Sequence, residues 1–598
     1  MFKAFLKKHS FSEYDFSTVC YPDISNREYW DNYASKNLVA EAEKYLSYGW
    51  PPIKATLFME FKKSGNRVCM EDVHFERREA FMRLVMGELK ENKGRFLGQI
   101  VDGMFSLCEE SYWGLSAHYY KKLTNIPSPY DPFIDLFAAE TAEHLAVACT
   151  LLRSSLLEFC PEIIERVERE LEIRIKEPYF SHTDFHWMGY EIKPANWNPW
   201  ILSNILTVFL LTEKDRSRLE LGLSKMFVEI QHYYDAIPSD GGCDEGVHYW
   251  DRAGAALFEF VYQLKLASGG ALDLFGDEKL GKMGLYTKNA HISGARFICF
   301  ADCSQTKKTA LIPFIYGYGR ETNKPELMSL AKEVFRDGEI DAYAPCVTMR
   351  RNILCHDLIE EMLSRKDISD YEGEKCAVMQ ELQVATVREG EWVVAAKGGN
   401  NAESHNHNDI GSFCLYHGGE AVLCDVGTGV YSRKNFSPQR YEIPWVRSLT
   451  HNLPEINGIE ERNGKEYAAD SFSAGEGFVK ISFASAYPTE AGISSLVRRC
   501  ELKEKGLTVT DEFVFSGEGK KITEAFVTTL PVRIDSDSVI IGEKYRVKAS
   551  LGAPKTEFYS FEGDTNLVGS WKCEGLTRIT FTAENVKAFT VSVEKIKA

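Results

Sequence analysis

The hydrophobic pattern of this 598-residue chain changes once, and that change limits the folds available to it. Over about the first 340 residues, apolar side chains recur at helical spacing, as they do at Phe81, Leu84 and Leu89. A polar run, SRKDISDYEGEK, follows at 364–375. Beyond it, apolar and polar residues alternate between Gly and Asn turns, which is typical of strands. Helices followed by strands, without alternation between them, disfavour a Rossmann or TIM-barrel fold.

We therefore predict two large domains, an N-terminal (α/α) toroid over residues 1–370 and a C-terminal antiparallel β-sandwich over residues 371–598. No fixed-period repeat supports the toroid. Helices are predicted near 75–93, 97–109, 132–158, 160–176, 200–213, 215–235, 252–268 and 324–337, and strands at 392–397, 412–417, 421–426 and 507–515.

Bulk properties exclude several classes of partner. A net charge of −17 disfavours a nucleic-acid surface, and no apolar run approaches a membrane span of about 18 residues. The N-terminus lacks the apolar core of a secretory signal, and the 15 cysteines form no CxxC pair. We expect a cytoplasmic protein with reduced thiols, although a secreted or periplasmic form with a trimmed leader stays open. The oligomeric state is also open, with a homodimer among the options.

The segment SHNHNDIGSF, residues 404–413, combines His405 and His407 with several further polar groups. Asp425 and His451 follow downstream, and both residue types can bind Zn²⁺. Hydrogen-bonded surface histidines explain the segment equally well. A hairpin at 418–419 would set Asp425 opposite Ser412, so His407 reaches Asp425 only if residues 408–411 bend the chain.

The loop DGGCDEGVHYW, residues 240–250, places Asp244, Glu245, His248 and Tyr249 close together in sequence. A tyrosine can act as an acid or a base when a neighbour stabilises its phenolate. The alternative is that Tyr249 is a core aromatic residue at the start of the next helix.

Two other segments could contact sugars. NWNPW, at 196–200, offers Trp197 for stacking and Asn196 or Asn198 for a carboxylate, and Trp113 and His118 have the same character. Packed indoles beside a helix cap explain these residues equally well.

An acidic protein that binds a polyanion needs a locally basic cleft. The only candidate stretch contains Arg433, Lys434, Arg440 and Arg447 with one acidic residue, Glu442. A solvated loop is the alternative.

These residues resemble the heparinase II/III family of polysaccharide lyases. The most specific matches are SHNHNDIGSF, then Asp425 in DVGTGVY, then His451 in RSLTHN. The family has a helical toroid followed by a β-sandwich, so the resemblance implies the same architecture here.

The resemblance also implies catalytic roles. Tyr249 resembles the tyrosine that protonates the leaving glycosidic oxygen and can also abstract the C5 proton, and His405 resembles the base on the other face of the sugar. Asn196 resembles the residue that neutralises the uronate carboxylate, with Asn198 as a competing assignment. Several relatives have Asn-His there, whereas this chain has Asn196-Trp197, so a second base from that histidine is in doubt.

Binding roles follow in the same way. His407, Asp425 and His451 resemble the ligands of a structural divalent metal, usually Zn²⁺. No organic cofactor is implied. The predicted substrate-binding residues are Trp113, His118, Trp197, Asn198, Glu245 and Arg440.

The resemblance implies a lyase that cleaves glycosaminoglycan chains or oligosaccharides, such as hyaluronan, chondroitin or heparan, by β-elimination to a 4,5-unsaturated uronate. An alginate or oligoalginate lyase is the nearest alternative, and a non-catalytic carbohydrate-binding protein is the alternative from another class. A glycoside hydrolase would need two separated carboxylates in the cleft, and the only obvious pair, Asp244 and Glu245, is adjacent in sequence.

Overall fold

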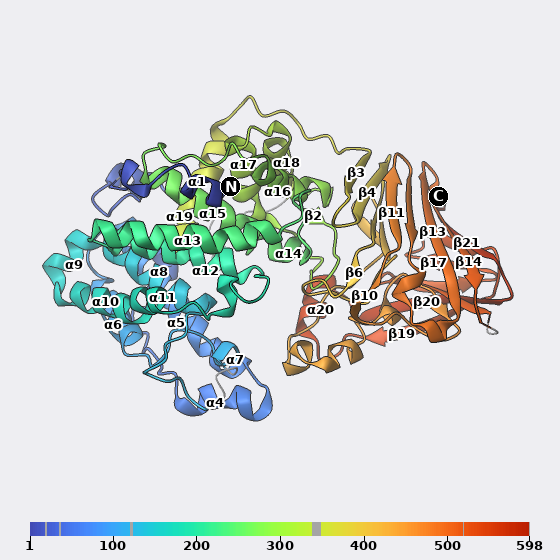
Figure 1. The fold of residues 1–598 in the computed structure, drawn as a ribbon, viewed down its shortest axis with the longest axis horizontal. Helices are drawn as coiled ribbons and strands as arrows, with labels where there is room; N and C mark the ends of the chain where they lie inside the picture. Colours follow the sequence, from blue (N-terminus) through green and yellow to red (C-terminus); the bar gives the residue numbers. More distant parts are fainter. Residues whose placement is uncertain (18–20, 35–36, 120–123, 338–347, 518–519, 597–598) are drawn as a thin grey trace. The chain divides into compact units, whose positions relative to one another are not determined.

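The computed structural model describes residues 1–17, 21–34, 37–119, 124–337, 348–517 and 520–596. The chain forms two compact units that are interleaved along the sequence. Unit 1 comprises Met1–Ile237, Arg252–Asp277 and Ile340–Lys366, and unit 2 comprises Pro238–Asp251, Glu278–Glu339 and Asp367–Ala598. Helices precede antiparallel sheets, which confirms the predicted fold class (Figure 1). The predicted division at residue 370 stays a prediction, but the loop of Tyr249 belongs to the same unit as the strands.

Unit 1 is helical, and several of its helices begin at a side-chain cap. The carboxylate of Asp135 accepts hydrogen bonds from the backbone N–H groups of Phe137 and Ala138, and Asp215 and Thr348 cap two other helices in this way. The described helices are α1 (Phe2–Leu6), η1 (Phe11–Glu13), α2 (Arg27–Asn32), α3 (Leu38–Glu43), α4 (Ala55–Ser64), α5 (Val68–Glu91), α6 (Leu97–Cys108), α7 (Ser116–Tyr119), α8 (Leu136–Leu151), α9 (Arg153–Phe159), α10 (Glu162–Leu171), the π-turn η3 (Glu172–Lys176), α11 (Glu177–Ser181), η4 (His186–Met188), α12 (Trp197–Thr212), α13 (Arg216–Ala236), α15 (Gly254–Ala267) and α19 (Met349–Ser364).

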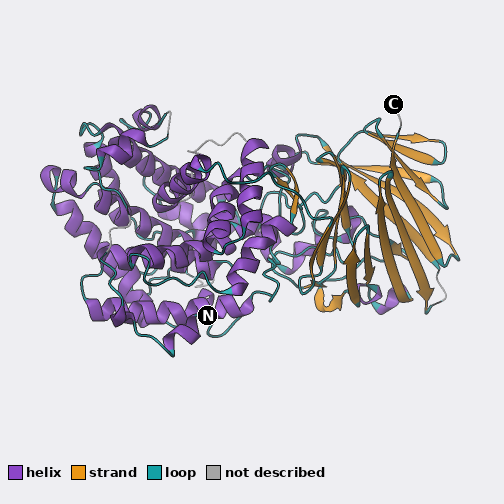
Figure 2. Cartoon of the chain, turned by 90° about the horizontal axis from the view of Figure 1, so that it is seen from above, coloured by secondary structure: helices purple, strands orange, loops and turns teal. Residues whose placement is uncertain are grey.

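Unit 2 contains three main antiparallel sheets together with helices and short helical turns (Figure 2). The sheets have the strand orders β11-β12-β13-β14-β21-β18-β17-β16, β3-β4-β5-β7-β8 and β19-β20-β15-β9. The strands are β1 (His291–Ser293), β2 (Arg296–Phe297), β3 (Cys376–Met379), β4 (Val384–Glu389), β5 (Trp392–Lys397), β6 (Asn400–Asn401), β7 (Phe413–His417), β8 (Glu420–Leu423), β9 (Glu455–Ile456), β10 (Gly464–Ala468), β11 (Ser471–Gly475), β12 (Phe478–Ser482), β13 (Ile493–Lys503), β14 (Gly506–Phe515), β15 (Lys521–Thr528), β16 (Val532–Asp535), β17 (Ser538–Ile541), β18 (Tyr545–Ala549), β19 (Pro554–Ser560), β20 (Gly575–Glu584) and β21 (Ala588–Lys595). The helices are α14 (Gly246–Trp250), α16 (Glu278–Asn289), η5 (Thr309–Leu311), α17 (Ile312–Glu321), α18 (Pro325–Asp337), η6 (Arg433–Phe436), η7 (Pro438–Glu442), η8 (Ser448–Thr450), η9 (Ala484–Ala486), η10 (Thr489–Ala491) and α20 (Thr565–Trp571).

The sandwich core forms where alternate residues of facing sheets meet. β13 alternates buried and partly exposed side chains along most of its length, and its Leu496 and Cys500 pack in one cluster with Val394 and Phe413 of the five-stranded sheet. This cluster fixes the register of the strands, because a shift by one residue would turn the apolar face outward.

Most predicted elements exist with small errors at their ends. The predicted strand at 392–397 is β5 exactly as bounded, and the predicted helix at 132–158 is the two helices α8 and α9. Helices α4, α16, α17 and α19 were not among the predictions. Two of them contain the pairs Gly281/Gly284 and Gly317/Gly319, which weaken a helical pattern in the sequence.

Two bulk predictions concern the described part of the chain. No helix within it is both long and apolar enough to cross a membrane. The cysteines of the described residues are all free thiols.

Candidate active site

The rings of Tyr249 and His405 stack on each other within unit 2, with centroids 4.2 Å apart and planes 22° apart. Tyr249 lies on the short helix α14, which begins at Gly246, a glycine with φ +84°. His405 has φ +55°, a left-handed conformation that a histidine adopts at some energetic cost. Both side chains remain partly exposed. The rings touch instead of facing each other across a sugar-sized gap, so a ligand must approach their exposed edges.

The carboxylate of Asp302 organises this pair. One oxygen, Oδ2, bonds to Nδ1 of His405 and accepts the Tyr431 hydroxyl, each at 2.8 Å. The other, Oδ1, lies 3.1 Å from Nε2 of His407 and 2.9 Å from Nη2 of Arg440. Asp302 itself is buried. This single carboxylate therefore connects the candidate catalytic histidine to the first histidine of the candidate metal site.

Tyr431 connects Asp302 to the phenol of Tyr249. Its hydroxyl donates to Asp302 and lies 2.8 Å from the Tyr249 hydroxyl. Because the hydrogen of Tyr431 is used by Asp302, its oxygen is free to accept the hydrogen of Tyr249. The result is a chain of hydrogen bonds from Tyr249 through Tyr431 to Asp302 and His405.

Burial and charge set the protonation of this chain. Burial raises the pKa of Tyr249 above its ordinary value, so the phenol is protonated at neutral pH. Burial also opposes ionisation of Asp302, but hydrogen bonds from His405 and His407 outweigh it and hold the pKa of Asp302 well below its usual range. For His405, burial lowers the pKa, and the bond to Asp302 reverses this, leaving the pKa above its ordinary value.

His407, Asp425 and His451, the three predicted metal ligands, come together in the structure. Each offers a ligand atom within 4.8 Å of the others, and all three side chains are fully buried. Asp425 Oδ2 lies 2.9 Å from Nδ1 of His451. The remaining nitrogens, Nδ1 of His407 and Nε2 of His451, are buried without a hydrogen-bond partner among the described residues. Two such nitrogens beside a carboxylate fit a divalent metal such as Zn²⁺.

The bend required by the sequence brings His407 to Asp425. The backbone N–H of Ser412 donates to the carbonyl of Asp409 at 3.0 Å, and Gly411 has φ +83°. A Cβ at Gly411 would lie 2.7 Å from the Phe483 ring, so the bend also needs glycine for space.

Arg498 secures this bend from inside the sandwich. Its fully buried guanidinium donates to the carbonyls of Gly411 and Asn452 and pairs with Asp511 at 2.6 Å and Glu524 at 3.3 Å. It therefore ties the loops that carry His407 and His451 to strands β13, β14 and β15.

We expect Arg498→Met to destabilise the fold by about 3 to 5 kcal/mol, because it leaves Asp511 and Glu524 buried without their cation. Urea unfolding measures this change. Arg533→Met, at an exposed arginine paired with Glu543, is the matched control and should leave the midpoint unchanged. Equal midpoints for Arg498→Met and the unmutated protein would contradict this role.

Glu461, on the other side of the same bend, is buried, and its Oε2 accepts from Asn401 and from the backbone of Ile410. Burial raises the pKa of Glu461 to about 8. Glu461 therefore binds a proton more tightly in the folded state than in the unfolded state. The protonated carboxyl stabilises the folded state at low pH, and this contribution is lost as pH rises from about 4.5 through 8.

We expect Glu461→Gln to keep an oxygen that accepts the hydrogen bonds from Asn401 and Ile410, and to remove the ionisable carboxyl group. Relative to this variant, the unmutated protein should lose about 3 kcal/mol of stability between pH 5 and pH 8. Unfolding midpoints measured across that range give the difference. A constant difference between the two proteins would show that Glu461 does not titrate in this way.

The predicted residues of unit 1 divide into two groups. Trp113 and Asn198 are enclosed: the Trp113 indole donates to the Leu107 carbonyl, and the Asn198 amide donates to the carbonyls of Trp187 and Glu229. Both side chains therefore have structural partners in the core, and their predicted contacts with a substrate stay predictions.

His118 and Trp197 form an aromatic group that is partly exposed. Their ring centroids lie 4.6 Å apart, and His118 Nδ1 lies 2.7 Å from Asp135. Asn196 is buried at the N-cap of α12 next to Trp197. The roles predicted for these three residues stay predictions.

Two predicted substrate-binding residues lie in unit 2. Glu245 is buried near Tyr249, where its charge helps to raise the pKa of that tyrosine. Arg440 donates to Asp302 and to the carbonyls of His405 and Asn406, so its guanidinium supports the loop of His405.

The rest of the predicted basic stretch is largely neutralised. Lys434 pairs with Glu442, and Arg447 pairs with Glu460. Arg433 is exposed. The stretch therefore presents less free positive charge than its sequence indicated.

Sequence reasoning missed Asp302 and Tyr431. Asp302 lies in a loop with no recognisable motif, and its neighbour Ala301 has φ +60°. Tyr431 stood in the DVGTGVY segment used to identify Asp425, and a polar aromatic so close to that aspartate was a usable signal.

Known proteins share this fold. Residues 373–445 match the family model described as Heparinase II/III-like, C-terminal. No curated protein sequence matches the chain. A crystal structure of heparinase III is 13% identical, with a TM-score of 0.66 and coverage of 100% of this chain and 91% of that one. A heparan sulfate lyase HepC mutant from Pedobacter heparinus is 14% identical, with a TM-score of 0.63 and coverage of 100% and 87%.

A heparinase III structure with methylated lysines is 11% identical, with a TM-score of 0.65 and coverage of 95% of this chain and 86% of that one. Identities this low establish a shared fold. Together with the family match at residues 373–445, they confirm the resemblance found in the sequence, and the chain has the fold of the solved heparinase III structures.

Proposed function

We propose that this protein is a polysaccharide lyase that cleaves a uronic-acid-containing chain by β-elimination. The observation that supports this most is the hydrogen-bonded chain from Tyr249 through Tyr431 and Asp302 to His405. It offers a protonated phenol and an oriented imidazole side by side, each partly exposed. The fold shared with structures described as heparinase III and heparan sulfate lyase supports the same reaction.

In this mechanism His405 is the base. Asp302 accepts the hydrogen of Nδ1, so Nε2 keeps its lone pair and can take the proton from C5 of the uronate. The electron pair left on C5 forms the C4–C5 double bond as the C4–O bond breaks. Tyr249 gives its proton to the departing oxygen and is returned to the phenol by the proton taken up at His405, through Tyr431 or solvent. Tyr249 can also serve as the base if its own proton is first released.

The negative charge that develops on the carboxylate during proton removal needs a hydrogen-bond donor. We assign this role to Asn196, as the resemblance implies. Both amide hydrogens of Asn198 already bond to carbonyls in the core, and this favours Asn196 over Asn198 as the donor. An Asn196→Ala variant should therefore lower kcat in the ultraviolet assay.

A divalent metal bound by His407, Asp425 and His451 would hold the loop of His405 to the strands of the sandwich. Its role there would be structural, because it would join these loops while the proposed proton transfers use Tyr249 and His405. Within the chain, the backbone of His405 is held by Arg440, and Asp302 joins the side chains of His405 and His407.

We expect protein purified without chelator to contain about one equivalent of Zn²⁺ by elemental analysis, and His451→Ala to lose it. Removal of the metal should lower the thermal unfolding midpoint, because the buried nitrogens of His407 and His451 then lack a partner. Metal-free purified protein with an unchanged midpoint after chelation would disprove the ligand set.

The substrate we favour is a glycosaminoglycan of the hyaluronan, chondroitin or heparan type, with alginate as the alternative. Incubation with a panel of these polymers tests the proposal, because the unsaturated product absorbs in the ultraviolet. Rising absorbance supports a lyase, and the polymer that gives it identifies the substrate. New reducing ends without absorbance would indicate a hydrolase, and binding without either product would indicate a non-catalytic carbohydrate-binding protein.

A further inference from the structure

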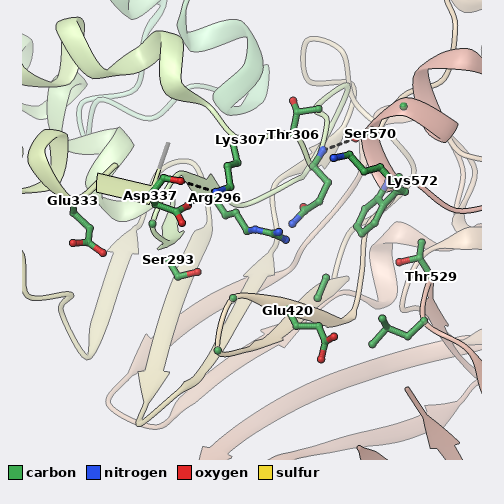
Figure 3. Close-up of a pocket in the computed structure, with 18 residues that line it drawn as sticks. Ser293, Arg296, Thr306, Lys307, Glu333, Asp337, Glu420, Thr529, Ser570 and Lys572 are labelled. Carbon is green, nitrogen blue, oxygen red and sulfur yellow. Dashed lines mark hydrogen bonds and ion pairs between the residues drawn. The ribbon is translucent and has the colours of Figure 1, made fainter. Parts of the chain in front are cut away.

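A polar cavity lies within unit 2, and none of the residues of the Tyr249–His405 site lines it. Its volume is about 920 Å³, which is enough for a short oligosaccharide. Figure 3 shows its walls: Ser293 and Arg296 at strands β1 and β2, Thr306 and Lys307 on the following loop, and Ser570 and Lys572 at the end of α20. Segments far apart in the sequence therefore build one site.

Basic and acidic side chains line this cavity in equal number, but they are not evenly paired. Asp337 pairs with Lys307, and Glu420 pairs with Lys544 outside the cavity. Arg296 and Lys572 form no ion pair among the described residues, although the charge of Arg296 helps to lower the pKa of Asp337, and Glu333 is the one lining carboxylate without an ion pair. Figure 3 shows Glu333 beside Asp337 and away from Lys572. The part of the cavity between Arg296 and Lys572 is therefore suited to an anion, although the whole chain has a net charge of −17.

Gln305 gives an independent indication of a ligand. Its side chain lines the cavity and is 8% exposed, yet neither the amide nitrogen nor the amide oxygen has a hydrogen-bond partner among the described residues. A buried amide without partners is costly unless something else supplies them. The backbone holds the residue in place, because its N–H donates to the Ser570 hydroxyl at 2.8 Å.

The remaining lining residues fit a sugar. Trp571 lines the cavity with its indole fixed by a hydrogen bond to the Val426 carbonyl at 3.1 Å. Fixed aromatic rings bind the apolar faces of sugar rings at little entropic cost. Thr306, Thr529 and Ser570 add hydroxyl groups that can exchange hydrogen bonds with those of a sugar.

We propose that this cavity binds an acidic saccharide, with its carboxylate or sulfate between Arg296 and Lys572 and a sugar hydroxyl on Gln305. The site is separate from the proposed catalytic site, and its binding does not depend on turnover. Gln305 and Asp302 lie on the same loop between β2 and η5, so a chain bound here would contact the loop that orients His405.

Hydrogen–deuterium exchange of the Tyr249→Phe protein tests the proposal without turnover. The probes are hyaluronan and chondroitin sulfate hexasaccharides, with maltohexaose as the neutral sugar and sodium sulfate as the free anion. We expect both acidic hexasaccharides to slow exchange at residues 293–297 and 569–573 at millimolar concentration or below. Maltohexaose should have no effect there, and sulfate alone should need at least tenfold higher concentration.

Variants identify the contacts. Arg296→Ala and Lys572→Ala should each raise the Kd obtained from this protection at least tenfold, and Gln305→Leu should raise it by a smaller factor. Arg533→Ala, at an exposed arginine of β16, is the matched control and should leave the Kd unchanged. Thermal unfolding checks that each variant folds. If Arg296→Ala does not fold, Lys572→Ala still tests the site, because Lys572 is exposed.

Three results would overturn the proposal. One is the absence of protection at both segments with either acidic hexasaccharide, and another is equal protection by maltohexaose. The third is saturation by sulfate at the concentration that the hexasaccharides require, which would make this an ion site. A failure of the lyase proposal would be seen separately, as absent ultraviolet product from the unmutated protein.

Discussion

Tyr249→Phe is expected to lower kcat by about 1,000-fold, because it removes the only hydroxyl hydrogen that the proposed mechanism transfers to the leaving oxygen. The ring stays, so the stacking on His405 at 4.2 Å and the burial of the neighbouring residues are preserved. KM should change little, since the phenol acts during bond cleavage and not in ground-state binding. The measurement is the initial rate of ultraviolet absorbance on the best polymer of the panel.

Two further tyrosine-to-phenylalanine substitutions serve as comparisons for this result. Tyr431→Phe removes a hydroxyl that bonds to both Tyr249 and Asp302, and it should lower kcat by a smaller factor, about 10-fold to 100-fold. Tyr130→Phe changes a tyrosine that is 94% exposed and should have no effect. Full activity in Tyr249→Phe would remove this residue from the mechanism.

Asp302→Asn is expected to lower kcat by about 100-fold or more, although Asp302 acts through His405 and does not contact the sugar. The amide of asparagine can donate to Nδ1 of His405, which places the ring hydrogen on Nε2 and removes the lone pair that takes the C5 proton. KM should again stay close to its original value.

A second measurement distinguishes positioning from a general loss of structure. Asp302 also bonds to Nε2 of His407, so Asp302→Asn should weaken metal retention about 10-fold to 100-fold in a chelator titration. Asp537→Asn, at an exposed aspartate paired with Lys548, is the control and should alter neither property. If kcat fell and metal retention did not, Asp302 would support His405 alone; an unchanged kcat would contradict its role.

Much of the fold could be predicted from the sequence because both periodicities are local. The hydrophobic periodicity of strand β5 and of helix α6 can be recognised within about ten residues of sequence. The helices α8 and α9 were predicted as one, because the short break near Leu152 carries no Gly or Pro to mark it. Glycine pairs in α16 and α17 had the opposite effect and hid helices that tertiary packing stabilises.

Only part of the candidate site could be predicted from the sequence in this way. The types and order of His407, Asp425 and His451 singled them out, and the need for a bend at 408–411 could be stated in advance because the hairpin geometry required it. Trp113 and Asn198 show the limit of this approach, since an indole or an amide in a sequence has the same appearance whether it packs in a core or contacts a ligand.

By itself, the sequence determined the order of helices and strands, because this order depends on local pattern. Its resemblance to a known family singled out the residues of the candidate metal site and the tyrosine and histidine of the candidate active site. Only the tertiary structure decided that Asp302 and Tyr431 join that tyrosine to that histidine, and that Arg440 faces inward to support them. These partners lie up to 182 positions apart in the sequence, and hydrogen bonds between such distant residues are set by the packing of the whole unit and leave no local pattern.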